Sequence, residues 1–178
     1  NESFGAKKPT ICIVEIMGRN AGWLTAAAAL AKGADCSGAD AIYLPEKVFD
    51  MDAFMAKVKE LAATKSSVVI AVSEGIHIAD GRYVCELANA NVAVDAFGHK
   101  QMSGTAAYLA QIVAAETGLK TRAIEFSTLQ RAATHLASLT DINEAFQVGH
   151  AAVIAAEEGK SGMMITLDRN GEDPYQCG

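Results

Sequence analysis

Apolar residues along this chain form short continuous runs that alternate with segments of helical spacing. The apolar runs predict buried strands at residues 11–16, 41–45, 67–73, 121–127 and 161–167. The intervening segments predict helices at residues 23–31, 50–63, 83–90, 103–117, 129–138 and 141–158, and residues 93–98 stay open between an edge strand and a loop. Alternating strands and helices imply βαβ crossovers. We therefore expect an α/β fold, a three-layer α/β/α sandwich with a mostly parallel sheet of the Rossmann-like kind.

The composition is that of a globular protein with a modest acidic excess. The chain has 178 residues, of which 51% are hydrophobic and 20% are charged, so it can bury a core as a single domain. A net charge of −6 argues against a nucleic acid or an anionic membrane as the main partner. Any phosphate site must then be a local cluster of basic residues. No apolar run approaches the length of a transmembrane helix.

The cysteines and the first residue bear on the cellular context. The four cysteines, Cys12, Cys36, Cys85 and Cys177, form no Cys-x-x-Cys pair. We expect free thiols in a reducing, cytoplasmic environment rather than disulfides or a zinc site. The chain starts at Asn1 instead of methionine, and we expect a piece of a longer protein.

The first predicted strand leads into the turn Met17-Gly18-Arg19 and then into an alanine-rich helix from Trp23. In a parallel sheet, ligands bind at the carboxyl ends of the strands. The helix start offers backbone N–H groups and a positive dipole end to an anion. Arg19 can donate two hydrogen bonds to a phosphate or carboxylate. The pattern favours an anionic small molecule at this turn, with a solvated arginine in an ordinary connection as the alternative.

Charged residues also follow the other strands: Glu46 after the second, Glu74 after the third and Arg131 beyond the fourth. Because parallel strands end at one edge of a sheet, Arg19, Glu74 and Arg131 are expected to lie together. Two arginines and one carboxylate suit a sugar phosphate, since arginine binds phosphate and carboxylate accepts from hydroxyls. The alternatives are a helix-start carboxylate for Glu74, a surface position for Arg131 and a turn role for Glu46.

Arg122 lies at the start of the fourth strand and so belongs to the opposite edge of the sheet. It can serve only a different pocket, or the pocket of a neighbouring subunit. The sequence contains no Ser/His/Asp arrangement, no Walker loop and no cluster of metal ligands. We therefore assign no catalytic residue and no metal ligand from pattern alone.

Several of these segments resemble, in the same order, those of the 6-phosphofructokinase family. Residues 14–22 are similar to the family's Met-Gly-Arg segment. Further similarities are a Pro-Glu strand end at 42–46, a Glu-Gly turn at 72–75, a Thr-Arg-Ala segment at 121–123, a Gln-Arg pair at 129–131 and the closing helix at 145–162. The resemblance covers nearly the whole chain. The loop 97–104 and the run 126–131 are most similar to the pyrophosphate-dependent branch.

The resemblance implies a set of roles for particular residues. Fructose 6-phosphate would be bound through six residues: Met17, Gly18 and Arg19 at the turn, Glu74 on a sugar hydroxyl, Arg131 on the 6-phosphate, and Arg122 on the 6-phosphate of an adjacent subunit in a homo-oligomer. Arg19 would also support the transition state. The chain departs from the family at Thr128, where many members carry histidine or tyrosine, and at Thr10, where many carry a basic residue.

The family's phosphoryl-donor half has a Gly-Gly-Asp-Gly loop and a Thr-Ile-Asp-Asn-Asp segment, and this sequence contains neither. That half supplies the catalytic base and the surroundings of Mg²⁺. The resemblance thus implies that residues 1–178 are a single fragment, the sugar-phosphate part of a glycolytic enzyme that makes fructose 1,6-bisphosphate with pyrophosphate, and that they are inactive alone. ATP as the donor is one alternative. A non-catalytic sugar-phosphate or effector-binding module is another.

Overall fold

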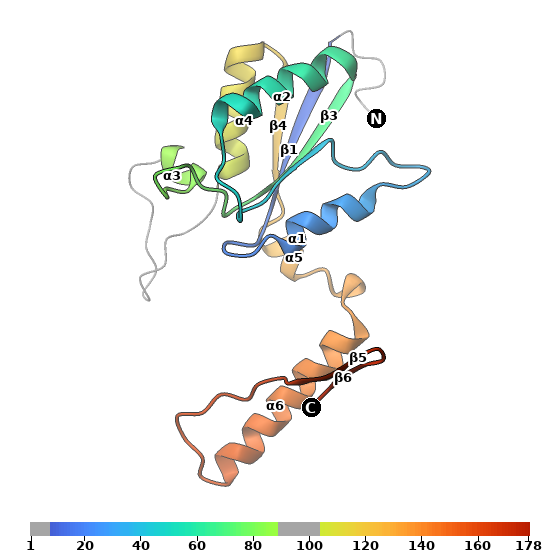
Figure 1. The fold of residues 1–178 in the computed structure, drawn as a ribbon, viewed down its shortest axis with the longest axis vertical. Helices are drawn as coiled ribbons and strands as arrows, with labels where there is room; N and C mark the ends of the chain where they lie inside the picture. The colour runs from blue at the N-terminus through green and yellow to red at the C-terminus, as the bar shows by residue number, and fades with distance from the viewer. Residues whose placement is uncertain (1–7, 89–103) are drawn as a thin grey trace. The chain divides into compact units, whose positions relative to one another are not determined.

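The computed structural model describes residues 8–88 and 104–178, and its chain divides into two compact units, Asn1–Gln130 and Arg131–Gly178 (Figure 1). The first unit contains a four-stranded sheet of β1 (Thr10–Ile16), β2 (Ala41–Tyr43), β3 (Ser67–Ser73) and β4 (Lys120–Glu125). The strand order is β2-β3-β1-β4, and every neighbouring pair is parallel. The register aligns Ile16 with Ser73, so β1 and β3 end side by side.

The helices of the first unit lie on both faces of this sheet, as predicted. They are α1 (Trp23–Ala26) with the 3₁₀ helix η1 (Ala27–Ala31), α2 (Met51–Thr64), α3 (Val84–Ala88) and α4 (Thr105–Thr117). The connection from β1 to β2 crosses the sheet in one direction, and those from β2 to β3 and from β3 to β4 cross it in the other. Right-handed crossovers then require α1 on one face and α2 with α4 on the other. The three-layer α/β/α class is confirmed.

The core lies between the sheet and the α2/α4 layer. Ile11 and Ile13 of β1 are buried, and Cys12 between them is half-buried. This is the alternation of a strand with one well-covered face. From the helices, Phe54 and Leu109 are fully buried against them. The rings of Phe54, Phe49 and Tyr43 pack within 5.3–5.4 Å of one another. This core fixes β1 and β3 as the rigid base of the sheet.

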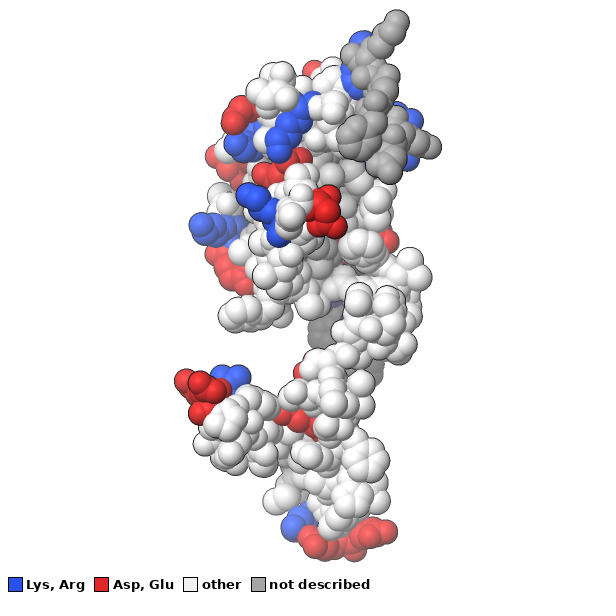
Figure 2. Space-filling view, turned by 90° about the vertical axis from the view of Figure 1, so that its right-hand side faces the viewer, with Lys and Arg blue, Asp and Glu red and all other residues white. Residues whose placement is uncertain are grey.

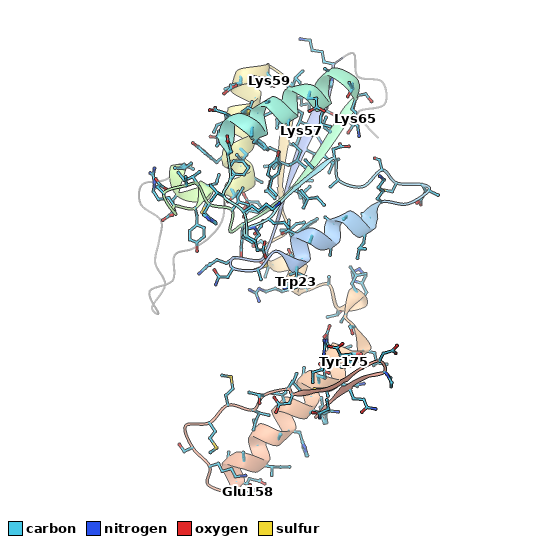
Figure 3. The ribbon with its side chains drawn as sticks, viewed as in Figure 1. Trp23, Lys57, Lys59, Lys65, Glu158 and Tyr175 are labelled. Atoms are coloured by element: carbon cyan, nitrogen blue, oxygen red, sulfur yellow. The ribbon has the colours of Figure 1, made fainter. Side chains whose placement is uncertain are left out.

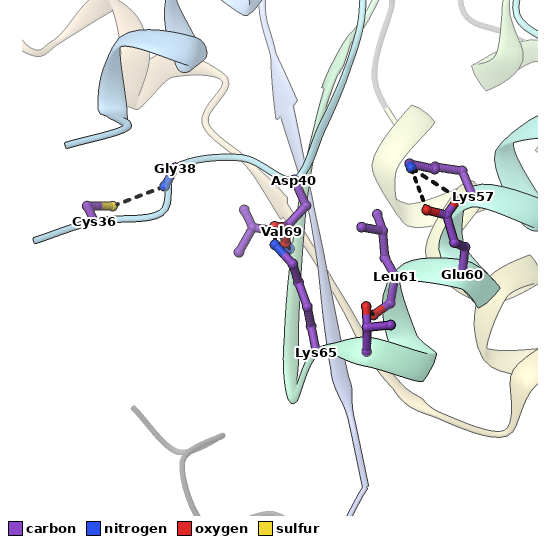
Figure 4. Close-up of polar contacts among 9 residues, drawn as sticks. Cys36, Gly38, Asp40, Lys57, Glu60, Leu61, Lys65 and Val69 are labelled. Atoms are coloured by element: carbon purple, nitrogen blue, oxygen red, sulfur yellow. Dashed lines mark hydrogen bonds and ion pairs between the residues drawn. The ribbon is translucent and has the colours of Figure 1, made fainter. Parts of the chain in front are cut away.

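The edge where β2 joins β3 is fastened by one carboxylate. Asp40 Oδ2 accepts a hydrogen bond of 2.8 Å from the backbone N–H of Val69, and Asp40 Oδ1 pairs with Lys65 (Figure 4). The Asp40 side chain is only 5% exposed. A nearly buried carboxylate needs such partners, because its desolvation costs several kcal/mol if it is left alone.

The second unit contains α6 (Leu139–Glu157) and an antiparallel hairpin of β5 (Arg169–Glu172) and β6 (Tyr175–Cys177), after the 3₁₀ helix η2 (Thr134–Leu136). Ser138 caps α6 by accepting from the N–H of Asp141. The hydroxyl of Tyr175 donates to the Glu144 carboxylate, which joins hairpin and helix. The visible face of this unit is largely uncharged, with charged side chains near its ends (Figure 2).

Three predictions about elements are wrong, each for a local reason. Residues 161–167 are not a strand: they carry no regular structure, and Met163 and Met164 are 74% and 84% exposed. An apolar run becomes a strand only where a partner completes its hydrogen bonds, and no described strand pairs with it. The predicted helix 129–138 is broken into α5 (Thr128–Arg131) and η2, and the second half of the helix at 23–31 is 3₁₀.

Candidate functional site

The predicted binding turn lies at the place in the sheet where the chain changes direction. From the end of β1 the chain leaves toward α1 on one face, and from the neighbouring end of β3 it leaves toward α3 and α4 on the other. Two diverging connections at adjacent carboxyl ends mark the position at which parallel α/β sheets bind ligands. Met17-Gly18-Arg19 follows β1 there, and Glu74 follows β3.

Three hydrogen bonds from other segments hold this turn. The backbone N–H of Gly18 donates to Glu74 Oε1 at 3.2 Å, and the hydroxyl of Ser73 donates to the Gly18 carbonyl at 2.6 Å. The N–H of Met17 donates to Gln130 Oε1 at 3.0 Å. The backbone N–H of Glu74 also donates to the Ile16 carbonyl at 3.0 Å. The turn is therefore fixed before any ligand arrives, which lowers the entropic cost of binding.

Glycine is required at two positions of this arrangement. Gly18 has a φ of +142°, and a Cβ there would lie 2.6 Å from the Ala21 carbonyl oxygen. A Cβ on Gly75 would lie 1.9 Å from the carbonyl oxygen of Arg19. Only glycine lets the backbones after β1 and β3 approach this closely. The contact places Arg19 directly against the segment that carries Glu74.

The chemistry offered at this position is that of an anion site with a hydroxyl acceptor. Arg19 is partly buried, and its planar guanidinium can donate two parallel hydrogen bonds to a phosphate or carboxylate. Glu74 is also partly buried, and one of its oxygens already accepts from Gly18. A carboxylate has further lone pairs that can accept from a hydroxyl of a ligand. The structure thus brings together Met17, Gly18, Arg19 and Glu74.

The start of α1 does not form the anion cradle expected from the sequence. The N–H of Gly22 donates to Glu46 Oε1 at 2.6 Å, so a carboxylate of this chain already occupies that position. The α-helical part of α1 is only four residues long, which gives little dipole. Trp23, its first residue, is 81% exposed (Figure 3). Glu46 has the turn role that was one alternative for it.

The structure does not place Arg122 with these residues. It is the third residue of β4, pairs in register with Cys12, and is exposed. Three further strand residues separate it from the carboxyl end, which is about 10 Å. Arg131 ends α5 and is the first residue of the second unit, so its role stays a prediction. Most of the loop 97–104 lies outside the described residues.

One buried carboxyl group lies directly beneath the site. Glu15 of β1 is 5% exposed, and Ala106 N–H donates to its Oε2 at 2.8 Å. Burial, with a smaller contribution from the nearby carboxylates of Glu125 and Glu74, raises the pKa of Glu15 to about 7 against the opposing effect of the backbone N–H groups of Ala106 and Thr105. Glu15 therefore changes its protonation in a pH range near neutrality.

Sequence reasoning missed several residues that shape this site. The sequence pattern shows Gln130 only as the neighbour of Arg131, yet its side chain accepts a hydrogen bond from Met17. Ser127, which has a φ of 44°, begins the reversal after β4 that brings Gln130 back to the sheet. Glu15 and Ser73 carried a usable signal, because each is a polar residue within an otherwise apolar strand. Such residues need a partner, and here the partners are elements of the site.

In ranges 8–88 and 104–178, no group of three or more His, Cys, Asp or Glu side chains is arranged to hold a metal ion. No magnesium ligand is therefore assigned among the described residues. Within the same ranges, no helix is both long and apolar enough to span a bilayer.

Comparison with known proteins places this geometry in a family. The phosphofructokinase family model matches residues 4–158. The pyrophosphate--fructose 6-phosphate 1-phosphotransferase of Xanthomonas campestris pv. campestris is 42% identical over 93% of this chain and 39% of its own length. The protein of the same name from Halomonas elongata is 38% identical over 97% of this chain and 40% of its own length.

A solved structure agrees with these relatives. The crystal structure of the pyrophosphate-dependent phosphofructokinase from Nitrosospira multiformis has a TM-score of 0.67 and 32% identity, and the match covers 99% of this chain and 39% of that one. The Pichia pastoris phosphofructokinase, at 23% identity and a TM-score of 0.56, shares the fold. This chain thus spans about two fifths of the length of the curated relatives described. It belongs to the phosphofructokinase family.

Proposed function

We propose that this chain is the sugar-phosphate-binding part of a pyrophosphate-dependent phosphofructokinase. The whole protein would transfer a phosphoryl group from pyrophosphate to the 1-hydroxyl of fructose 6-phosphate, in glycolysis. The observation that carries the proposal is the Met17–Arg19 turn at the switch point of the sheet, held by Glu74. The relatives described above support pyrophosphate as the donor, because each is named for that reaction.

In this proposal each residue has a defined task. Arg19 and Arg131 neutralise phosphate charge, and Arg19 also stabilises the charge that develops during transfer. Glu74 accepts a hydrogen bond from a sugar hydroxyl, and the backbone of Met17 and Gly18 forms the wall of the site. Holding the sugar in one orientation is a large part of catalysis, since phosphoryl transfer depends mainly on positioning and charge neutralisation.

The remaining expectations belong to the same proposal. Arg122 would bind the 6-phosphate in the site of an adjacent subunit, which makes the enzyme a homo-oligomer. Phosphofructokinases as a family use Mg²⁺, and we assign it no ligand among the described residues. The four cysteines are free, and we propose a cytoplasmic enzyme. Residues 1–178 form a single fragment that binds the sugar but transfers no phosphoryl group alone.

The donor is tested by direct assay. The complete reading frame that contains this sequence is expressed, and formation of fructose 1,6-bisphosphate is followed with pyrophosphate and with ATP in turn. We expect turnover with pyrophosphate as the donor and no turnover with ATP. Turnover with ATP alone would overturn the choice of donor and leave the sugar site standing. Binding of fructose 6-phosphate without turnover on either donor would instead show a non-catalytic module.

The sugar-phosphate site is tested by replacing its central arginine. We expect Arg19→Ala to raise the KM for fructose 6-phosphate by about ten- to a hundredfold, because a charge-assisted hydrogen bond contributes about 1.5–3 kcal/mol. Arg82→Ala is the matched control: Arg82 is 60% exposed and pairs with Asp80 on a turn outside the site. Its KM should stay within about twofold of the unsubstituted enzyme. Equal effects of both substitutions would place the sugar elsewhere.

A further inference from the structure

Helix α4 begins without a cap of its own. Its N-cap residue is Gly104, with a φ of 94°, and glycine has no side chain that could accept a hydrogen bond at this end. The first backbone N–H groups of a helix have no partner within the helix, and burying one unsatisfied costs about 1–3 kcal/mol. Thr105 and Ala106 are both fully buried, so water cannot serve here. Another element must supply the acceptor.

Glu15 is that acceptor, although it lies far away in sequence and on a different element. Its Oε2 accepts from the N–H of Ala106 at 2.8 Å, and the backbone N–H of Thr105 also favours its ionised form. Ala106 is the second residue of α4, one of the two positions whose N–H a capping side chain normally satisfies. A carboxylate there also faces the positive end of the helix dipole.

The same contact is coupled to the proposed sugar site from two directions. Along β1, Glu15 lies two residues before Met17, so it fixes the strand from which the binding turn emerges. Through α4, the hydroxyl of Thr105 donates to the backbone carbonyl of Glu74 at 3.4 Å. Glu74 in turn accepts from Gly18 at 3.2 Å. Each of these contacts therefore supports the next, from β1 to the start of α4, then to Glu74, and from Glu74 back to the turn that follows β1.

We propose that Glu15 is a positioning residue for fructose 6-phosphate, which caps α4 from β1 and so holds Glu74 against the Met17–Arg19 turn. This inference rests on the proposed function. Glu15 touches no substrate and acts only through Glu74 and the turn. The proposed site then includes Glu15, which lies beneath the residues that the sequence singles out.

The ionised form of Glu15 makes the stronger cap. The charged groups that face it are Glu125 on β4 and Glu74 after β3, with the thiol of Cys85 on α3 also close. Burial together with these carboxylates raises the pKa of Glu15 to about 7. Below that pH the group is protonated and loses its charge-assisted hydrogen bonds. Affinity for fructose 6-phosphate should therefore rise as the pH rises through about 7.

The test uses three variants of the complete reading frame, with the KM for fructose 6-phosphate measured from pH 6 to 8.5, a range of about one unit or more on each side of the pKa. Glu15→Ala should raise KM about five- to tenfold, because loss of the cap loosens the start of α4 and with it Glu74. The effect on kcat should be smaller. Glu15→Gln keeps an acceptor of the same shape, so it should restore most of the affinity while removing the pH dependence. Glu125→Gln should shift the midpoint of the profile to lower pH, because it removes a like charge.

The possible results separate this proposal from the proposed function. If the unsubstituted protein does not bind or use fructose 6-phosphate, both fall together. If the unsubstituted protein is active and its KM depends on pH in the same way as that of Glu15→Gln, the positioning role is overturned while the function stands. A role for Glu15 in folding alone would lower the yield or the melting temperature without moving the midpoint in Glu125→Gln. That outcome also overturns the proposal, even where Glu15→Ala fails to fold.

Discussion

At the scale of single residues, the site depends on atoms that are absent as much as on side chains that are present. Gly75 carries no Cβ, and this lets the Arg19 carbonyl lie where a Cβ would be only 1.9 Å away. The clash would be with backbone rather than with the end of a flexible side chain. A methyl group added here must move the whole turn. Gly75, which has no charge and no side chain, thus sets the position of Arg19.

We expect Gly75→Ala to weaken binding of fructose 6-phosphate by at least about tenfold and to destabilise the fold by about 1–3 kcal/mol, as overpacking does. Calorimetric titration and urea unfolding measure the two effects. Gly149→Ala is the control, because Gly149 lies within α6 with open space around its Cβ position. Alanine there should raise helix stability by about 0.5–1 kcal/mol. Unchanged affinity in Gly75→Ala would mean that the turn moves without consequence.

At the scale of elements, the sequence predicts best where periodicity and burial agree. The strands at 11–16 and 67–73 and the helix at 50–63 occur within a residue or two of their predicted bounds, since each has an apolar face that the core uses. The run 161–167 is also largely apolar, but it pairs with no strand among the described residues, and pairing is not encoded in composition. The contact between Gln130 and Met17 was equally hidden, because it depends on the reversal after β4.

The packing of α2 on β3 illustrates the energetic side of the same point. Phe54 is fully buried, and its ring lies 5.3 Å from that of Phe49. We expect Phe54→Ala to cost about 3–5 kcal/mol in the free energy of unfolding. Phe146→Ala makes the same change on α6 at a side chain that is 74% exposed, and should cost less than about 0.5 kcal/mol. Urea unfolding followed by circular dichroism compares them, and equal costs would contradict the core described here.

At the scale of the whole molecule, the position of Arg122 within β4 bears on the proposed sharing of a site between two subunits. Most residues implied by the family resemblance follow the carboxyl ends of strands, but Arg122 pairs with Cys12 in the body of the sheet and is exposed. A guanidinium there cannot reach the ends of its own strands, about 10 Å away, without leaving the strand that carries it. If it binds the 6-phosphate of a sugar held at the Met17–Arg19 turn, it must do so in the site of a neighbouring subunit.

Mixing two inactive variants tests this sharing of a site. Arg19→Ala and Arg122→Ala should each lose most activity in the protein made from the complete reading frame. In a symmetric two-chain interface that contains one copy of each variant, one site lacks both arginines and the other keeps both. Random reassociation of equal amounts should then restore about a quarter of the unsubstituted activity, because half of the pairs are mixed and half of their sites are intact. If Arg122 instead serves its own chain, no mixture contains an intact site, and activity stays at the level of the separate variants.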